Sequence, residues 1–342
     1  MSPLRRVRWT SPGITRRRQG RGFTYLHPNG QRVKDGDTLE RIRALAIPPA
    51  WTDVWICPDD RGHLQAVGTD AAGRRQYRYH DDWRVRRDRQ KFDRALRFAA
   101  KLPKIREATH DALSTRAPTK ERALAGAVRL LDLGAFRVGS ESYAEANGSY
   151  GLATLRRSHV RVEGDEVRFD YVAKGGKRQV QRIRDPDVAR LTRSLLRRKD
   201  GGEELLAHRE GGTWRDVRSE DINAYLKELA DEEISAKDFR TWHATVLTAV
   251  LLASAEEELT SVTSRKRVVS AVVKEVAEVL GNTPAVCRAS YIDPRVIDLF
   301  LDGETIELPR NGGELSDQRF RERAEAAVIA LLGAPDAPAR AA

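Results

Sequence analysis

Apolar residues recur with two different periods along this chain of 342 residues, and the change falls near residue 90. Before it, short β-branched and aromatic stretches alternate with Pro, Gly, Asn and Asp, which is typical of strands and turns. After it, apolar residues recur every three or four positions between capping residues, which is typical of helices. We therefore predict an α+β protein, with a small β-rich N-terminal domain over residues 1–90 and a mainly helical domain over 91–333. The Ala/Pro-rich residues 334–342 are predicted to be disordered.

Local patterns predict the elements of the N-terminal domain. Pro28-Asn29-Gly30 predicts the turn of a hairpin between strands at 23–26 and 31–33. A short helix fits 38–45, with Asp37 as its N-cap, and further strands are expected at 51–56, 63–67 and 75–80. Residues 1–25 carry seven arginines and no acidic residue. Two interpretations of that segment stay open: a solvated arm, or a tail that touches DNA.

The second domain is predicted to be helical apart from a three-stranded meander. Thr119 can cap a helix that stops at Gly134, and alternating residues over 160–180 predict the strands, with turns at 163–166 and 174–177. Ser219 and Ser235 begin two more helices, the second with Asp238 in a capping box and running to about residue 257. A valine-rich helix over about 266–280 stops at Gly281. Thr283-Pro284 and Asp293-Pro294 then open two others, since proline suits the first helical position.

The charge of the chain favours a polyanionic partner. It has 61 basic and 50 acidic residues, for a net charge of +11, and nucleic acid is the commonest partner for such a balance. The two cysteines, Cys57 and Cys287, are far apart, which fits a reducing compartment and excludes a disulfide framework. No apolar run approaches the roughly 20 residues that span a bilayer. We therefore expect a cytoplasmic protein with no membrane partner.

One tyrosine and three cations stand in settings that suggest fixed positions. Tyr291 follows Gly281-Asn282-Thr283-Pro284, Arg137 follows the stop at Gly134, Lys174 lies at a hairpin tip, and Arg240 lies on the helix that begins at Ser235. A tyrosine can attack a phosphodiester, and guanidiniums can bind the non-bridging oxygens of the dianionic transition state. The leaving alkoxide needs a proton, which a lysine with a pKa lowered by neighbouring cations can give. Lys177 and Arg178 are such neighbours of Lys174.

Each of these residues also has a purely structural interpretation. Arg137 can be a surface arginine at a helix end, Arg240 can form an ion pair with an aspartate, and Tyr291 can be a half-buried tyrosine with a hydrogen-bonded tip. His243 is more often a core histidine than a catalyst. A non-enzymatic nucleic-acid binder that uses its basic surface is the alternative of a different class.

Motifs for metal or nucleotide chemistry are missing from the sequence. It contains no HExxH or HxxH pair, no Asp/Glu cluster with metal-ligand spacing, and no GxxxxGK[ST] loop. We therefore expect activity without a metal ion and without ATP.

Taken together these segments resemble the type IB DNA topoisomerases of the compact bacterial and poxvirus kind, over roughly residues 21–300. The segments that carry the resemblance are, in chain order, residues 75–80, Phe136-Arg137-Val138-Gly139 through Tyr143, 151–155, the hairpin lysine Lys174, 237–241, and 281–284 with Tyr291 beyond. The resemblance implies a C-shaped clamp around double-stranded DNA, a monomer, and a nucleoid-associated location in the cytoplasm. It also implies relaxation of supercoils through a transient 3′-phosphotyrosyl link, strand swivelling and religation.

The resemblance also implies roles for single residues. Tyr291 would be the nucleophile, Arg137 and Arg240 would stabilise the transition state, and Lys174 would be the general acid. The residues implied to contact DNA are Arg74, Gln76, Tyr77, Tyr79 and Tyr143.

Asn282 departs from the family pattern, which often has histidine at this position. An amide can donate a hydrogen bond at neutral pH but cannot deliver a proton, so we assign Asn282 to a non-bridging oxygen. Nine residues of straight helix would separate it from Tyr291 by roughly 13 Å, so non-helical backbone near 281–284, or movement of the tyrosine on DNA, is expected. The closest rival is a tyrosine recombinase, but recombinases usually begin with a helical DNA-binding domain and commonly have histidine where this chain has Lys237.

Overall fold

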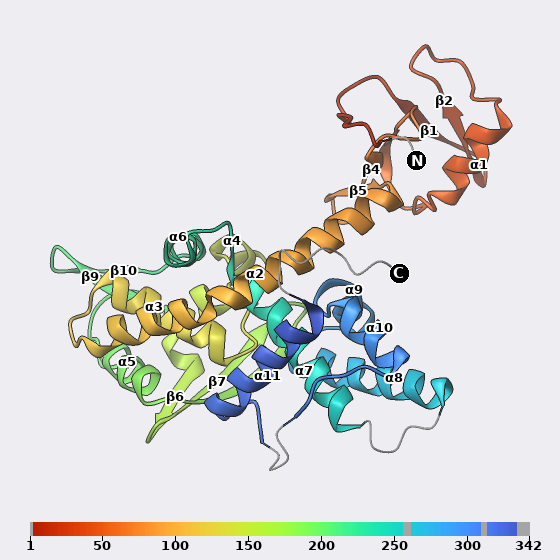
Figure 1. Cartoon of the computed structure of the whole chain (residues 1–342). Helices are drawn as coiled ribbons and strands as arrows, with labels where there is room; N and C mark the ends of the chain where they lie inside the picture. Colours follow the sequence, from red (N-terminus) through yellow and green to blue (C-terminus); the bar gives the residue numbers. More distant parts are fainter. Residues whose placement is uncertain (1–2, 256–260, 309–312, 334–342) are drawn as a thin grey trace. The chain divides into compact units, whose positions relative to one another are not determined.

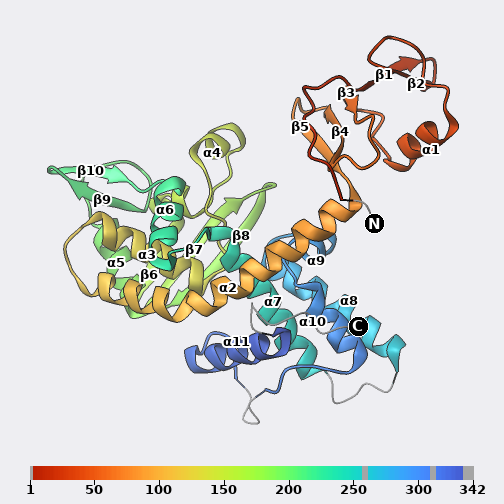
Figure 2. The same cartoon turned by 45° about the horizontal axis from the view of Figure 1, so that its top comes forward.

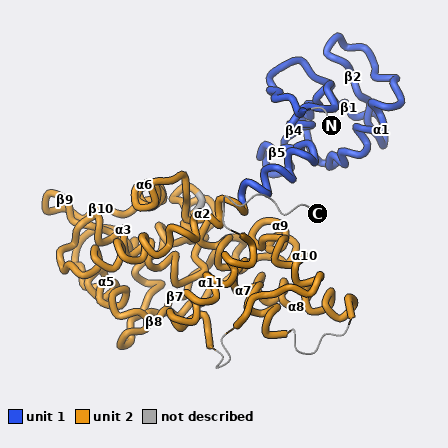
Figure 3. Tube along the Cα trace, viewed as in Figure 1, with its two compact units in different colours: residues 1–91 blue, residues 92–342 orange. Residues whose placement is uncertain are grey.

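The computed structural model describes residues 3–255, 261–308 and 313–333, except for the side chain of Tyr143. The predicted tail, 334–342, and the predicted end of the helix near residue 257 lie outside these residues. The chain divides into two compact units, residues 1–91 and 92–342 (Figure 3). Helix α2 (Asp81–Ser114) contains the boundary between them.

The first unit is built on a five-stranded antiparallel sheet with strand order β2-β1-β3-β4-β5 (Figure 2). Its elements are β1 (Ile14–Gln19), β2 (Gly22–Leu26), α1 (Gly36–Ala44), β3 (Thr52–Ile56), β4 (Leu64–Thr69) and β5 (Arg75–Tyr79). Ile42 of α1 packs with Val54, Ile56 and Ala66, so the helix covers one face of the sheet. This arrangement buries Ile14 of β1 and the inward side chains of β3 and β4, whereas every residue of β2 and β5 stays at least partly exposed.

One prediction for this unit was confirmed in part and another was wrong. The predicted turn at 28–30 forms, since the His27 amide donates to the Gln31 carbonyl at 2.8 Å and the Val33 amide to the Tyr25 carbonyl at 2.9 Å, but residues 31–33 are no strand, and the strand that pairs with β2 is β1. The N-cap of α1 is Asp35, whose carboxylate accepts a hydrogen bond from the Thr38 amide at 2.8 Å. Asp37 lies in the first turn instead, where its charge still favours the helix N-terminus.

The second unit combines helices with the three-stranded sheet β6-β7-β8 and the hairpin β9-β10 (Figure 1). Its first elements are α3 (Lys120–Leu133), α4 (Glu141–Asn147), β6 (Val160–Glu163), β7 (Glu166–Ala173), β8 (Lys177–Arg184) and α5 (Pro186–Leu196). The others are β9 (Ala207–Glu210), β10 (Thr213–Asp216), α6 (Ser219–Ala230), α7 (Ala236–Ser254), α8 (Val262–Val279), α9 (Pro284–Ser290), α10 (Pro294–Asp302) and α11 (Gln318–Leu332). Helix α3 packs against α5, α6 and α7, and nearly all its side chains from Arg122 to Asp132 are buried.

A buried ionic network fixes the end of α3 that leads to the site. Arg106 of α2 donates two hydrogen bonds to Asp132 at 2.8 and 3.0 Å, and two to Glu325 of α11, both at 2.8 Å. Burial alone would raise the pKa of Asp132, but the Arg106 guanidinium outweighs it and lowers the pKa to about 2. Bidentate pairs of this kind stay charged and hold a rigid geometry. The network therefore joins three helices at the point where the chain enters the loop of Arg137.

Candidate active site

Arg137 lies in the loop after α3, where two chain segments approach at backbone distance. The amides of Leu152 and Ala153 donate to the carbonyls of Arg137 and Val138 at 2.8 and 2.7 Å. Gly139 and Gly151 face each other at this contact. A Cβ added to Gly151 would lie 2.5 Å from the Gly139 Cα and 2.7 Å from the Arg137 carbonyl oxygen. Only the absence of a side chain allows this approach, so the two glycines define where the Arg137 backbone sits.

A helix-ending motif places Asn282 against the Arg137 guanidinium. The Asn282 amide donates to the Ala277 carbonyl at 2.8 Å and the Gly281 amide to the Glu278 carbonyl at 3.0 Å, with Gly281 at φ +62°, which together form a Schellman motif. Arg137 Nη2 then donates to Asn282 Oδ1 at 2.5 Å and to the Gly281 carbonyl at 3.2 Å. Because a guanidinium only donates, the asparagine must present its oxygen there. Its Nδ2 is left as a buried donor without a partner among the described residues.

Arg240 is held by main-chain carbonyls and not by a carboxylate. Its Nη2 donates to the Leu280 carbonyl at 2.8 Å and its Nη1 donates to the Ala135 carbonyl. No ion pair to Arg240 or Arg137 occurs among the described residues, so the structural interpretation of Arg240 as an aspartate's partner is not supported. Burial, and after it the charge of Arg137, lowers the pKa of Arg240 below its usual value. The ordinary pKa of a guanidinium is so high that Arg240 still carries its charge at neutral pH.

The predicted start of α7 orients Arg240 and Lys237 toward the same side. The Asp238 carboxylate accepts from the Ser235 amide at 2.8 Å, which is the predicted capping box, and also from Arg94 of α2 at 3.0 Å. Phe239 on the opposite side of the helix is fully buried. Lys237 and Arg240, three residues apart, therefore lie on one side of the helix, with Lys237 exposed and Arg240 buried.

Tyr291 lies at the C-terminal end of α9, and its half-buried ring meets the cations of α7. Its amide donates to the Cys287 carbonyl at 2.9 Å. The ring centroid is 5.1 Å from the Arg240 guanidinium carbon and 6.0 Å from Lys237 Nζ. Thr283 is in extended conformation before Pro284, so the backbone between Asn282 and Tyr291 is not one straight helix. This supplies the non-helical backbone that the spacing requires.

Lys174 lies between β7 and β8, at a turn made by Gly175 and Gly176 with φ of +82° and +73°. Arg178 on the return strand donates two hydrogen bonds to Asp170, both at 2.7 Å. The expected cluster of three cations at this tip is thus reduced, because one of them is neutralised by a carboxylate.

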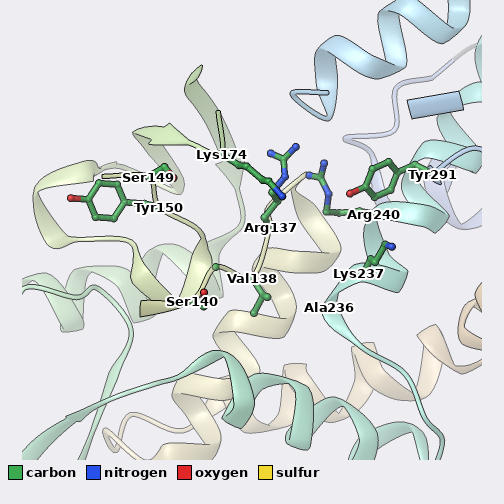
Figure 4. Close-up of a pocket in the computed structure, with 11 residues that line it drawn as sticks. Arg137, Val138, Ser140, Ser149, Tyr150, Lys174, Ala236, Lys237, Arg240 and Tyr291 are labelled. Atoms are coloured by element: carbon green, nitrogen blue, oxygen red, sulfur yellow. The ribbon is translucent and has the colours of Figure 1, made fainter. Parts of the chain in front are cut away.

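These side chains line one open cavity of about 270 Å³ (Figure 4). Four of the lining residues are cations, Arg137, Lys174, Lys237 and Arg240, and none of the eleven is acidic. Sequence reasoning did not include Lys237 in the site. It missed Tyr150 and Ser149 completely, although both precede the Gly151 contact, and the buried Ser149 hydroxyl has no partner among the described residues. Such a cavity can hold a tetrahedral dianion next to a phenol.

Some predicted site residues lie outside this cavity. Asn282 does not line it but contacts it through Arg137. Tyr143 is on α4, and its side chain is outside the described residues. His243 is a half-buried α7 residue, consistent with its core interpretation. Burial lowers the pKa of His243 to about 4, although Asp132 acts in the opposite direction.

Three of the four DNA-contact candidates of the first unit lie on β5, and the fourth, Arg74, directly precedes it. Tyr77 and Tyr79 are exposed and stacked, with ring centroids 6.2 Å apart. Alternation along the strand turns Gln76 to the other face, where it donates to Asp70 at 2.8 Å. Arg74 donates to the same carboxylate at 3.0 Å. The structure therefore brings Tyr77 and Tyr79 together as one surface, and Gln76 and Arg74 as an Asp70-centred group.

Neither a metal cluster nor a membrane span is found in the described parts of the chain. No three His, Cys, Asp or Glu side chains gather there as a metal ion would require. None of the helices described combines the length and the apolar character needed to cross a bilayer.

Comparison with known proteins matches both units. Residues 80–297 match the family described as eukaryotic DNA topoisomerase I, catalytic core, and residues 22–70 match the bacterial DNA topoisomerase IB N-terminal domain. DNA topoisomerase 1B of Acanthamoeba polyphaga mimivirus is 30% identical over 303 residues, covering 84% of this chain and 87% of the relative. DNA topoisomerase 1B of vaccinia virus (strain Copenhagen) is 22% identical, covering 85% and 91%. The chain belongs to the type IB DNA topoisomerases.

Proposed function

We propose that the chain relaxes supercoiled double-stranded DNA by cutting and resealing one strand through Tyr291. The observation that carries the proposal is the cavity in which Tyr291 meets four cations and no carboxylate. A phosphate is the group that such a cavity binds best, because each cation can bond an oxygen that carries charge.

In the cleavage step the Tyr291 oxygen bonds to phosphorus and its proton leaves to solvent. The bond from phosphorus to the 5′ oxygen breaks, and Lys174 gives that oxygen a proton, which leaves a 3′-phosphotyrosyl link and a 5′-hydroxyl. Arg137 and Arg240 bond the two non-bridging oxygens, where loss of one donor typically costs about 100- to 1,000-fold in rate. The unpartnered Nδ2 of Asn282 adds a neutral donor. Buried carbonyl contacts pre-position Arg240, so little reorganisation is needed when charge develops.

Religation reverses these bonds, since the 5′-hydroxyl attacks the phosphotyrosine after the cut strand has swivelled. The phosphodiester energy is kept in the covalent link, so the cycle consumes no ATP, and none of its steps uses a metal ion. A single chain carries every group in the cycle, so the proposal needs no second copy.

We further propose that the two units enclose the duplex as a clamp, with the Tyr77–Tyr79 surface and the Asp70-centred group of the first unit and Tyr143 of the second facing DNA. The matches of residues 22–70 and 80–297 to two domains of the family support the clamp, and Tyr143 lies within the second match, whereas residues 74–79 lie between the two.

Plasmid relaxation in EDTA without ATP tests the proposal. We expect negatively and positively supercoiled plasmids to relax stepwise, without a requirement for a particular sequence. Relaxation that appears only after Mg²⁺ or ATP is added would contradict the proposed chemistry. Strand exchange confined to one specific site would instead support the recombinase alternative.

A further inference from the structure

The first unit carries an ordered N-terminal segment that precedes β1 and the residues matched to the family's N-terminal domain, which begin at residue 22. We call residues 3–13 the arm. The Arg5 amide donates to the Arg61 carbonyl at 2.9 Å, and its carbonyl accepts from the His63 amide at 2.8 Å. The Val7 amide donates to Nδ1 of His63 at 3.2 Å. These bonds fix the arm along the segment that leads into β4, so it is not a freely solvated tail.

The arm lies on the sheet face that carries Tyr77 and Tyr79. Trp55, Val67 and Tyr77 are register partners across β3, β4 and β5, and so point to one face. The Trp55 indole donates to the Ser11 carbonyl at 2.9 Å. A Cβ on Gly13 would lie 2.0 Å from the same indole nitrogen, so the arm backbone rests directly on the ring. Helix α1 occupies the opposite face, where Ile42 packs on Val54 and Ile56.

In this position the arm brings cations and aromatic rings next to the two tyrosines. The Arg75 guanidinium, on the same face of β5, lies 4.0 Å from the ring centroid of Trp9. Stacking on an indole leaves the guanidinium N–H edges available to an outside acceptor. Arg6 lies 5.9 Å over the Trp83 ring. His63 contacts both Trp83 and Tyr79, with centroids 4.7 and 6.1 Å apart, so arm and strand form one continuous surface.

The charges on this surface are not neutralised within the unit. Arg6 and Arg8 are exposed and form no ion pair with any residue that the structure describes, whereas Arg5 pairs with Asp59 at 3.3 Å. No acidic residue occurs before Asp35 in the chain. Fixed, uncompensated arginines beside exposed aromatic rings are suited to phosphate oxygens on a duplex backbone.

We propose that Arg6, Arg8 and the Trp9–Arg75 pair form a further DNA-contact site, which binds backbone phosphates of duplex DNA beside the Tyr77–Tyr79 surface. This inference rests on the proposed function for its partner, but it concerns binding and not strand cleavage. Phosphate contacts add affinity without sequence preference and release counterions. The arm would therefore increase the affinity for any duplex, whatever its sequence, in keeping with an enzyme that relaxes DNA at many sites.

The test compares two double variants of the full chain that remove the same charge. Arg6→Ala with Arg8→Ala removes the proposed contacts. Arg32→Ala with Arg43→Ala removes two exposed arginines, one preceding α1 and one on it, that form no ion pair with described residues. Binding to a fluorescent 24-base-pair duplex is measured by anisotropy from 0.1 to 0.6 M NaCl, and thermal melting checks that each variant is folded.

We expect the arm variant to lose roughly 1.8 units of the slope of log K against log salt, because each phosphate contact contributes about 0.9. If the arm variant and wild type bind equally at 1 M salt, this difference in slope makes the arm variant's affinity about 30-fold weaker at 0.15 M. The control variant should keep the wild-type slope. Equal slopes for the arm variant and wild type, or equal losses for both double variants, would overturn the inference. Failure of the proposed function is separate, because it would appear as DNA cleavage that survives loss of the Tyr291 hydroxyl.

Discussion

Substitution of Gly151 by alanine tests whether the contact between two backbones positions Arg137. The glycine has φ of −135°, which any residue adopts, so the substitution adds no backbone strain of its own. The new Cβ would lie 2.5 Å from both the Cα and the amide nitrogen of Gly139. Carbon atoms in ordinary contact are about 3.5 Å apart, so the loop that carries Arg137 must move by about 1 Å.

A displacement of this size in a transition-state group can cost about 100-fold in rate. We therefore expect Gly151→Ala to slow single-turnover cleavage of a labelled duplex by about 100-fold, although the substitution touches neither DNA nor the Arg137 side chain. Overpacking should also cost about 1–3 kcal/mol of stability. The matched control is Gly211→Ala in the β9–β10 turn, where φ is +54° and a Cβ meets nothing within 4 Å.

The control should lose about 1–2 kcal/mol through left-handed backbone strain, with a fall in Tm of roughly 2–8 °C, yet cleave normally. Comparable stability losses with a cleavage defect only in Gly151→Ala would support the positioning role. Cleavage by Gly151→Ala at the wild-type rate, in a protein that melts below wild type, would refute the reasoning.

Three further predictions concern charge in and near the site. Arg240→Lys should slow single-turnover cleavage at least 100-fold, since a point charge cannot bond both carbonyls and the phosphate; a loss under tenfold would contradict this. Asn282→Asp should cut cleavage roughly 100-fold, because a carboxylate at 2.5 Å would neutralise Arg137, and wild-type activity would argue against that contact. The pKa of His243 falls to about 4 in the folded protein, below its ordinary 6.5, so the stability it contributes is lost as pH falls from 6.5 to 4. Measured by urea unfolding, the free energy of unfolding should fall less between pH 6.5 and pH 4 in His243→Gln than in wild type. Equal falls in the two proteins would contradict this prediction.

Elements with local start and stop motifs could be predicted from the sequence. The capping box of Ser235 and Asp238 begins α7 as expected, and Gly281 ends α8 because only the left-handed region closes its Schellman motif. In contrast β1 was missed, because only Ile14 of its six residues is buried and a run of three arginines hides the alternation. Helix α11 was also missed, since its buried face includes Arg321 and Glu325, which pair with residues far away in the chain.

Sequence predicted four side chains that line one cavity, Tyr291, Arg137, Lys174 and Arg240, but it did not predict their mutual geometry. Arg240 is fixed by the carbonyls of Ala135 and Leu280, which are 105 and 40 residues away and carry no side-chain pattern. The hydrogen bond from Arg137 to Asn282 spans 145 residues. The arm could not be interpreted from sequence for the same reason, because its position depends on the Trp55 indole and the backbone near residue 62.

The most direct test of the account is a covalent trap of the cleaved strand. Wild type and Tyr291→Phe are incubated in EDTA with a duplex labelled upstream of the cut, denatured, and separated by gel electrophoresis. Wild type should yield a DNA-linked protein band whose tryptic DNA-peptide contains Tyr291, and Tyr291→Phe should yield none while still binding the duplex. A covalent band of equal yield from Tyr291→Phe would contradict the account.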